Sequence, residues 1–110
     1  MLVLAMGYEY GFVFSLPLQP PQLEELLHYL ETAHPWLLLS AAPGDAYYIV
    51  RYAYAASGPL AWGEDFLVEV DSQQVYLLLH TATADQTARV LTWLRQGAAE
   101  LGLAGSVVEL

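Results

Sequence analysis

The 110-residue sequence predicts a single α+β domain, a two-layer sandwich in which two helices cover one face of a mostly antiparallel sheet. Two stripes of apolar residues at helical spacing, one in each half of the chain, predict the helices. Segments rich in tyrosine, valine and isoleucine predict five or six strands. The expected order is one strand, one helix, four strands, one helix and one strand. With 56% hydrophobic residues and no linker or internal repeat, residues 1–110 are expected to share one core.

The first strand is expected over residues 7–16, where aromatic residues recur at every second position. The first helix is expected over residues 21–34. Pro21 suits its first turn, because a proline there loses no hydrogen bond, and Pro35 cannot continue it. Four leucines fall on one stripe of this helix and are expected to be buried: Leu23, Leu26, Leu27 and Leu30.

A short apolar run at residues 36–40 predicts the second strand, and a turn separates it from a long strand at residues 47–55. In residues 47–55, tyrosine or aliphatic residues occupy both alternating faces. The second face of the sheet is therefore expected to be apolar and aromatic as well. The next two strands, 66–70 and 75–80, are joined by the polar turn 71–74, a pattern typical of a hairpin.

The last helix is expected over residues 84–101, because Thr83 and Gln86 form a capping box and Gly102 suits a left-handed residue after its end. A final strand is expected over residues 106–110. Apolar residues predict the inner face of this helix, with Trp93 beside them: Val90, Leu91, Leu94, Ala98 and Leu101.

The net charge of the chain indicates which classes of partner it can bind. Twelve acidic residues stand against three arginines and no lysine, for a net charge of −9. Such a field repels nucleic acid and anionic lipid and attracts basic partners. The chain has no cysteine, which excludes disulfides and thiol chemistry. The apolar stretch up to Met6 is too short for a membrane span and lacks the basic residues of a signal peptide, so a cytoplasmic protein is expected, with Met1 and Met6 both open as the start.

Catalytic patterns are weak. Glu24, His28 and Glu31 share one helical face, a spacing that suits a metal site but is also typical of a solvated helix. His80 ends a strand without any motif of a nucleophile nearby. The glycines near the C-terminus lack phosphate-binding spacing. We therefore expect a protein that is not an enzyme, with no catalytic residue, no metal and no cofactor.

The stronger pattern is that of a protein interface, because eight tyrosines, three tryptophans and three phenylalanines accompany the carboxylates. Large aromatic residues anchor binding energy at interfaces. In the segment 60–65, a tryptophan flanked by glycine precedes two acids, which suits an anchor inside an acidic rim. The expected partner-binding residues are Trp62, Glu64, Asp65, Glu69, Asp71 and Tyr48.

These properties predict a small acidic protein-binding module that neutralises a basic partner. Immunity proteins, which inhibit bacterial toxins, share the compact size and acidic surface. Two alternatives stay open. One is an acidic secretion chaperone that wraps an extended effector segment, although chaperones of that class generally begin with a helix. The other is a ferredoxin-like dimer with a ligand cavity between sheet and helices; a homodimer through the sheet face also fits the aromatic strands.

Overall fold

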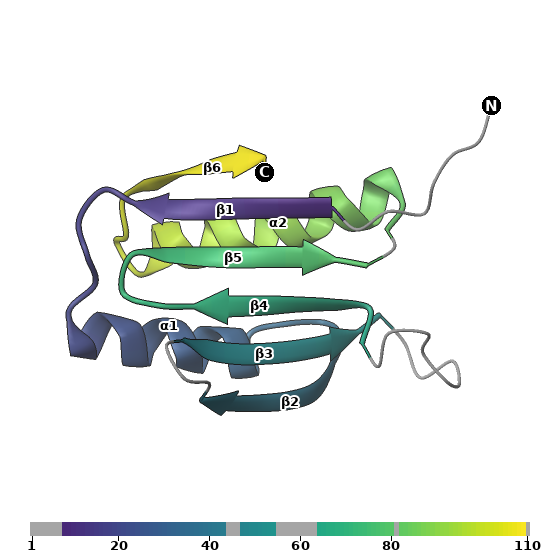
Figure 1. Cartoon of the computed structure of the whole chain (residues 1–110), viewed down its shortest axis with the longest axis horizontal. Coiled ribbons are helices and arrows are strands. Elements are labelled where there is room, and N and C mark those ends of the chain that lie inside the picture. Colours follow the sequence, from purple (N-terminus) through teal and green to yellow (C-terminus); the bar gives the residue numbers. More distant parts are fainter. Residues whose placement is uncertain (1–7, 44–46, 55–63, 81, 110) are drawn as a thin grey trace.

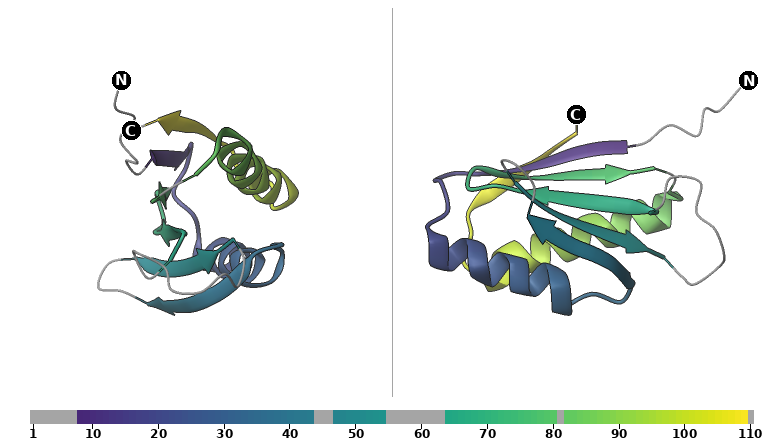
Figure 2. Two further views of the ribbon diagram at one scale, coloured as in Figure 1. Left: turned by 90° about the vertical axis from the view of Figure 1, so that its right-hand side faces the viewer. Right: turned by 60° about the horizontal axis from the view of Figure 1, so that its bottom comes forward.

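The computed structural model describes residues 8–43, 47–54, 64–80 and 82–109, and it confirms the predicted α+β sandwich (Figure 1). The elements follow the predicted order: β1 (Tyr8–Phe14), α1 (Pro20–Thr32), β2 (Leu37–Pro43), β3 (Tyr48–Ala53), β4 (Phe66–Val70), β5 (Gln74–Leu79), α2 (Ala84–Glu100) and β6 (Gly105–Glu109). One six-stranded sheet has the order β2-β3-β4-β5-β1-β6, and all neighbours are antiparallel. Both helices lie on one face of this sheet, and among the described residues no helix covers the other, helix-free face (Figure 2).

The ends of the elements differ from the predicted ones by at most three residues, and β4 has the predicted ends. The first strand ends at Phe14, so Leu16, which is inside the predicted range, lies beyond the strand and is exposed. Helix α1 ends at Thr32 because the chain turns around the ring of His34. The His34 Nδ1 atom lies 2.8 Å from the carbonyl oxygen of Trp36, and Nε2 lies 3.0 Å from that of Glu31. The imidazole thus links the end of α1 to the start of β2.

The caps of the last helix are as predicted. The Gln86 amide donates to Thr83 Oγ1 at 3.1 Å, and the Thr83 amide donates to Gln86 Oε1 at 2.9 Å, which completes a capping box. Gly102, just after the helix, has a φ of 67°, the left-handed conformation that a residue with a Cβ adopts at a cost.

One apolar cluster fills the space between the sheet and the helices. Leu26, Leu30 and Leu94 are buried in it, as predicted. Three other leucines expected there are only half-buried and pack against its margin: Leu23, Leu27 and Leu91. Helix α2 is rotated so that Val90 and Trp93 face the sheet, which explains the weaker burial of Leu91.

Many of the aromatic residues belong to this core. The rings of Tyr52 and Phe66 stack at 4.7 Å between centroids, and Trp36 contacts Trp93 edge-to-face at 5.0 Å. Buried polar atoms of the cluster are satisfied by the backbone: the Tyr52 hydroxyl donates to the carbonyl of Leu30, and Trp93 Nε1 donates to that of Ala33. Part of the aromatic content that suggested an interface therefore serves to join α1 to the sheet.

Candidate functional site

The five predicted binding residues that the structure describes do not form one surface. Trp62, the expected anchor, lies outside the described residues. Tyr48 lies on the helix side of the sheet, where it packs against the core and its hydroxyl donates to Glu31 Oε1 at 3.0 Å. Three effects raise the pKa of the Tyr48 phenol. The hydrogen bond to Glu31 contributes most, and burial and the charge of Glu31 add to it. Tyr48 is thus separated from the acidic residues of β4 that it was expected to accompany.

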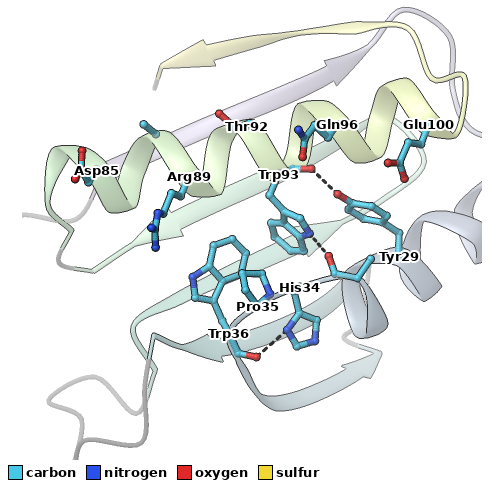
Figure 3. A pocket seen from close by; sticks show the side chains of 12 residues that line it. Tyr29, His34, Pro35, Trp36, Asp85, Arg89, Thr92, Trp93, Gln96 and Glu100 are labelled. Atoms are coloured by element: carbon cyan, nitrogen blue, oxygen red, sulfur yellow. Dashed lines mark hydrogen bonds between the residues drawn. The ribbon is translucent and has the colours of Figure 1, made fainter.

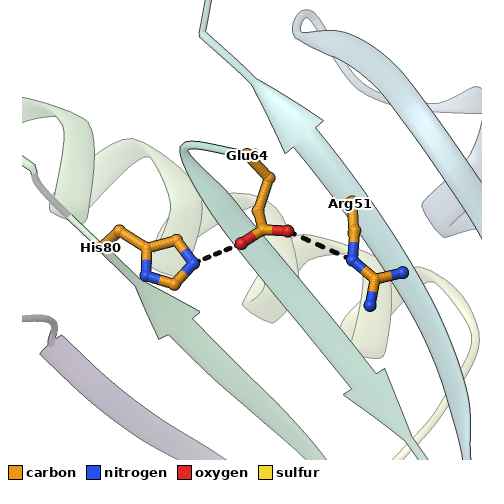
Figure 4. Close-up of polar contacts among 3 residues, drawn as sticks. All are labelled: Arg51, Glu64 and His80. Carbon is orange, nitrogen blue, oxygen red and sulfur yellow. Dashed lines mark hydrogen bonds and ion pairs between the residues drawn. The ribbon is translucent and has the colours of Figure 1, made fainter. Parts of the chain in front are cut away.

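Glu64 was expected in an open acidic rim, and the structure places it differently. The residue is only 8% exposed, and its carboxylate lies between Arg51 and His80 (Figure 4). Its Oε1 is 3.1 Å from Arg51 Nε, and its Oε2 is 2.5 Å from His80 Nε2. The carboxylate is therefore held by two partners of its own chain, which come from β3 and from the end of β5.

Asp65 holds the same end of the sheet together. Its Oδ2 accepts a hydrogen bond from the Tyr54 amide at 2.7 Å. Its own amide donates to the Tyr52 carbonyl, and its carbonyl accepts from the His80 amide. Because side chain and backbone are both used in this way, Glu64 and Asp65 have a structural role at the entry to β4.

Glu69 and Asp71 are half-buried at the other end of β4, on the helix-free face. The strand register places Ile49, Glu69, Tyr76 and Gly11 in one row across β3, β4, β5 and β1. Val68, next to Glu69, is buried in the core. Since successive side chains of a strand point to opposite faces, the row that contains Glu69 lies on the face without helices.

These two acids line a shallow pocket with two tyrosines. The pocket has a volume of about 270 Å³ and is formed by Tyr47, Glu69, Asp71, Gln74 and Tyr76. Asp71 also shapes the hairpin turn, because its Oδ1 accepts from the Gln74 amide at 2.9 Å. The pocket thus presents carboxylates beside phenol rings, and it is the part of the predicted acidic-aromatic surface that the structure assembles.

The electrostatics of this acidic pocket favour a bound cation. Burial raises the pKa of the Glu69 carboxyl, and the charge of Arg51 only partly offsets this. The Tyr76 hydroxyl donates to Glu9 Oε1, and burial followed by this bond raises the pKa of Tyr76 to about 12. A carboxylate that has lost part of its hydration is stabilised when a positive group replaces the missing water.

Tyr47 and Tyr76 were not among the predicted residues, although the sequence holds a signal for each. Tyr47 shares its strand parity with the charged Arg51, which marks the solvent side of β3. Tyr76 follows from the hairpin at residues 71–74, because a turn there places Val70 opposite Val75 and so Glu69 opposite Tyr76. Tyr48, which was predicted instead, belongs to the opposite parity and packs against the core.

A second hollow lies between the helices (Figure 3). It is an open groove of about 1000 Å³ between α2, the end of α1 and the segment that leads into β2. Tyr29 and Trp93 stack at its inner wall, and the Tyr29 hydroxyl donates to the Trp93 carbonyl at 2.8 Å. Asp85 and Arg89 stand along α2 at its rim. This groove has the size of a small-molecule site.

Other kinds of site find no support in the described part of the chain. Within it, no three acidic or histidine side chains are grouped so that they could hold a metal ion. Neither of its two helices is both long and apolar enough to cross a lipid bilayer. Comparison with models of known protein families and with curated protein sequences found no match.

Proposed function

We propose that this chain is a small acidic protein-binding module that neutralises a basic partner, as an immunity protein neutralises a bacterial toxin. The observation that carries the proposal is the acidic pocket on the helix-free face, where Glu69 and Asp71 lie beside Tyr47 and Tyr76. The role is binding rather than catalysis, and it is a cytoplasmic one.

The chemistry of the acidic pocket suits a lysine or arginine side chain of the partner. The Glu69 carboxyl is partly desolvated, so a cation bound there recovers electrostatic energy that water does not supply. The rings of Tyr47 and Tyr76 offer apolar and π surface to the stem and the charge of such a side chain. Tyrosine is enriched at protein interfaces, and arginine is enriched on the partner side as well.

The distribution of cations leaves this face open to a basic partner. All three arginines lie in the described residues, and two of them, Arg89 and Arg95, belong to α2 on the other layer. The third, Arg51, lies on the helix-free face, but its Nε is bound to Glu64. With a net charge of −9, the protein attracts a positive surface and accelerates its approach.

The chain would neutralise such a partner by covering its positive surface. Toxins that act on nucleic acid need a positive surface to hold their substrate. An acidic protein that binds this surface through matched charges competes directly with the phosphate backbone. We therefore expect the partner to be encoded by a neighbouring gene and to lose its activity when the two chains are mixed.

The test uses the purified product of the neighbouring gene and measures its affinity for this chain by calorimetry. Neutralising the acidic pocket with Glu69→Gln and Asp71→Asn keeps the side-chain shapes and the Asp71 turn. We expect the dissociation constant to rise by about tenfold or more, and we expect binding to weaken between about 0.05 M and about 0.3 M sodium chloride.

The matched control is Glu24→Gln with Glu25→Gln, which removes the same charge from the exposed side of α1. This control should leave the affinity nearly unchanged. The site is wrong if both double variants weaken binding equally. The function is wrong if the neighbouring product does not bind, or binds without loss of its activity.

The groove between the helices favours a second candidate function, the binding of a small ligand, although the ferredoxin-like alternative expected a cavity between the sheet and the helices. Trp36 and Trp93 both line this groove, so an occupant changes their fluorescence. A titration with a panel of small aromatic acids and amines tests this function. A saturable change that Ala88→Trp abolishes would support it, and no change across the panel would exclude this ligand class.

A further inference from the structure

One edge of the sheet is apolar and uncharged. Strand β2 lies at the end of the strand order, and no described strand pairs with its outer side (Figure 1). Its sequence, LLLSAAP, holds three consecutive leucines that remain substantially exposed: Leu37 at 42%, Leu38 at 39% and Leu39 at 44%. Contiguous apolar surface of this kind marks an interaction site more often than chance exposure.

The opposite edge is different. Strand β6 exposes Val108 to a similar extent, 43%, but the strand also carries the charge of Glu109. Natural proteins protect edge strands with charges, prolines and bulges, because the unpaired backbone groups of an edge pair readily with another strand. On β2 the protection is limited to a register shift between Leu38 and Ser40 and to Pro43 at its end.

We infer that β2 is a dimerisation edge, which pairs in antiparallel fashion with β2 of a second copy of this chain. The charge of the chain indicates which partner binds the β2 edge. Two copies that each carry −9 repel one another, and β2 is the described edge at which no like charges meet. A basic partner, in contrast, gains nothing from an uncharged edge and finds its complement at the acidic pocket.

The geometry of such a pair is restricted. Antiparallel pairing of two identical edges requires a two-fold axis perpendicular to the sheet, and the same residues then contact each other from both sides. This axis places the helix layers of both copies on one side. The two helix-free faces join into one surface that carries both acidic pockets. The inference is independent of the proposed function, because β2 and the acidic pocket share no residue.

Sedimentation equilibrium over about 1 µM to about 1 mM tests the inference on the full chain. The average mass of the wild type should rise from 12.2 kDa toward twice that value. Leu38→Glu places a charge on the edge and should raise the dimer dissociation constant by at least about tenfold. Val108→Glu is the matched control at the other edge, with similar exposure and the same added charge, and it should dimerise like the wild type.

Circular dichroism of each variant verifies that it folds. If Leu38→Glu does not fold, Leu39→Glu serves as the second edge variant. Hydrogen exchange adds a direct readout, since amides on the outer side of β2 should become protected only at high concentration. A wild type that stays at 12.2 kDa throughout overturns the inference. So does a dimer that survives both leucine variants and is broken by Leu78→Glu on the helix-free face.

Discussion

Gly97 of α2 lies directly against the ring of Tyr29 of α1. A Cβ atom at position 97 would come within 2.4 Å of Tyr29 Cε2, far closer than two carbon atoms approach without overlap. The same Tyr29 ring stacks on Trp93 and bonds to its carbonyl oxygen. A glycine at this point therefore allows the two helices to meet beside the groove.

Replacing Gly97 with alanine should destabilise the protein by about 1–3 kcal/mol, because the added methyl group forces the Tyr29 ring out of its stack. The loss of unfolding free energy from this clash exceeds the roughly 0.5–1 kcal/mol by which alanine is more favourable than glycine in a helix interior. Urea denaturation measures the difference. In a Tyr29→Ala background the obstacle is gone, so Gly97→Ala should become stabilising; a loss of equal size in both backgrounds contradicts the packing argument.

Leu30 and Leu27 belong to one predicted stripe but should respond differently to truncation. Leu30 is fully buried, so Leu30→Ala should cost about 2–5 kcal/mol of unfolding free energy. Leu27 is only half-buried at the margin of the core, and Leu27→Ala should cost below about 2 kcal/mol. Chemical denaturation of both variants side by side decides this, and equal losses would mean that α1 has another rotation.

Removing the charge of Glu64 should weaken the fold, because Arg51 and His80 both lose the negative charge that lies between them. We expect Glu64→Gln to cost about 1–3 kcal/mol, whereas the exposed Glu24→Gln should stay within about 0.5 kcal/mol. Arg51→Gln should add little in the Glu64→Gln background if the groups act together. Fully additive losses in denaturation experiments would show that Glu64 and Arg51 are not coupled.

The tyrosines make the fold sensitive to alkali. Burial, with a smaller effect of Asp65, raises the pKa of Tyr54 from 10.0 to about 12, and Tyr76 reaches a similar value. Tyrosines of the unfolded chain ionise near pH 10, so between about pH 10 and about pH 12 the folded state keeps protons that the unfolded state has lost. The free energy of unfolding therefore decreases as the pH rises through this range. The absorbance of tyrosinate should therefore appear late and with unfolding. Tyr54→Phe should flatten this pH dependence, and an unchanged slope would contradict the raised pKa.

Local patterns were sufficient for the architecture. The leucine spacing of α1, the capping box at Thr83 and Gln86 and the hairpin at residues 71–74 each depend on neighbours within a few positions, so their outcome is contained in the sequence. The ends were less accurate. The turn around His34 depends on the carbonyls of Glu31 and Trp36, a contact that no spacing of apolar residues encodes.

The structure does not group the predicted residues as expected where that grouping depended on contacts between distant segments. Nothing around Glu64 in the sequence shows that Arg51 and His80, from two other strands, come to either side of its carboxylate. The acidic pair was therefore interpreted as open surface. Glu69 and Asp71 were better predicted, because a strand and a tight turn keep alternate side chains on the solvent side by local geometry alone.

The sequence by itself determined the α+β class, the order of the elements, the large negative charge and the uncharged leucines of β2, since these are properties of composition and short-range periodicity. Only the tertiary structure decided which tyrosines face the core, which acids are already paired and which edge of the sheet is left apolar. Those outcomes depend on strand order and on the rotation of each helix. Both are set by the packing of residues far apart in the chain, where a small shift moves a side chain from surface to core.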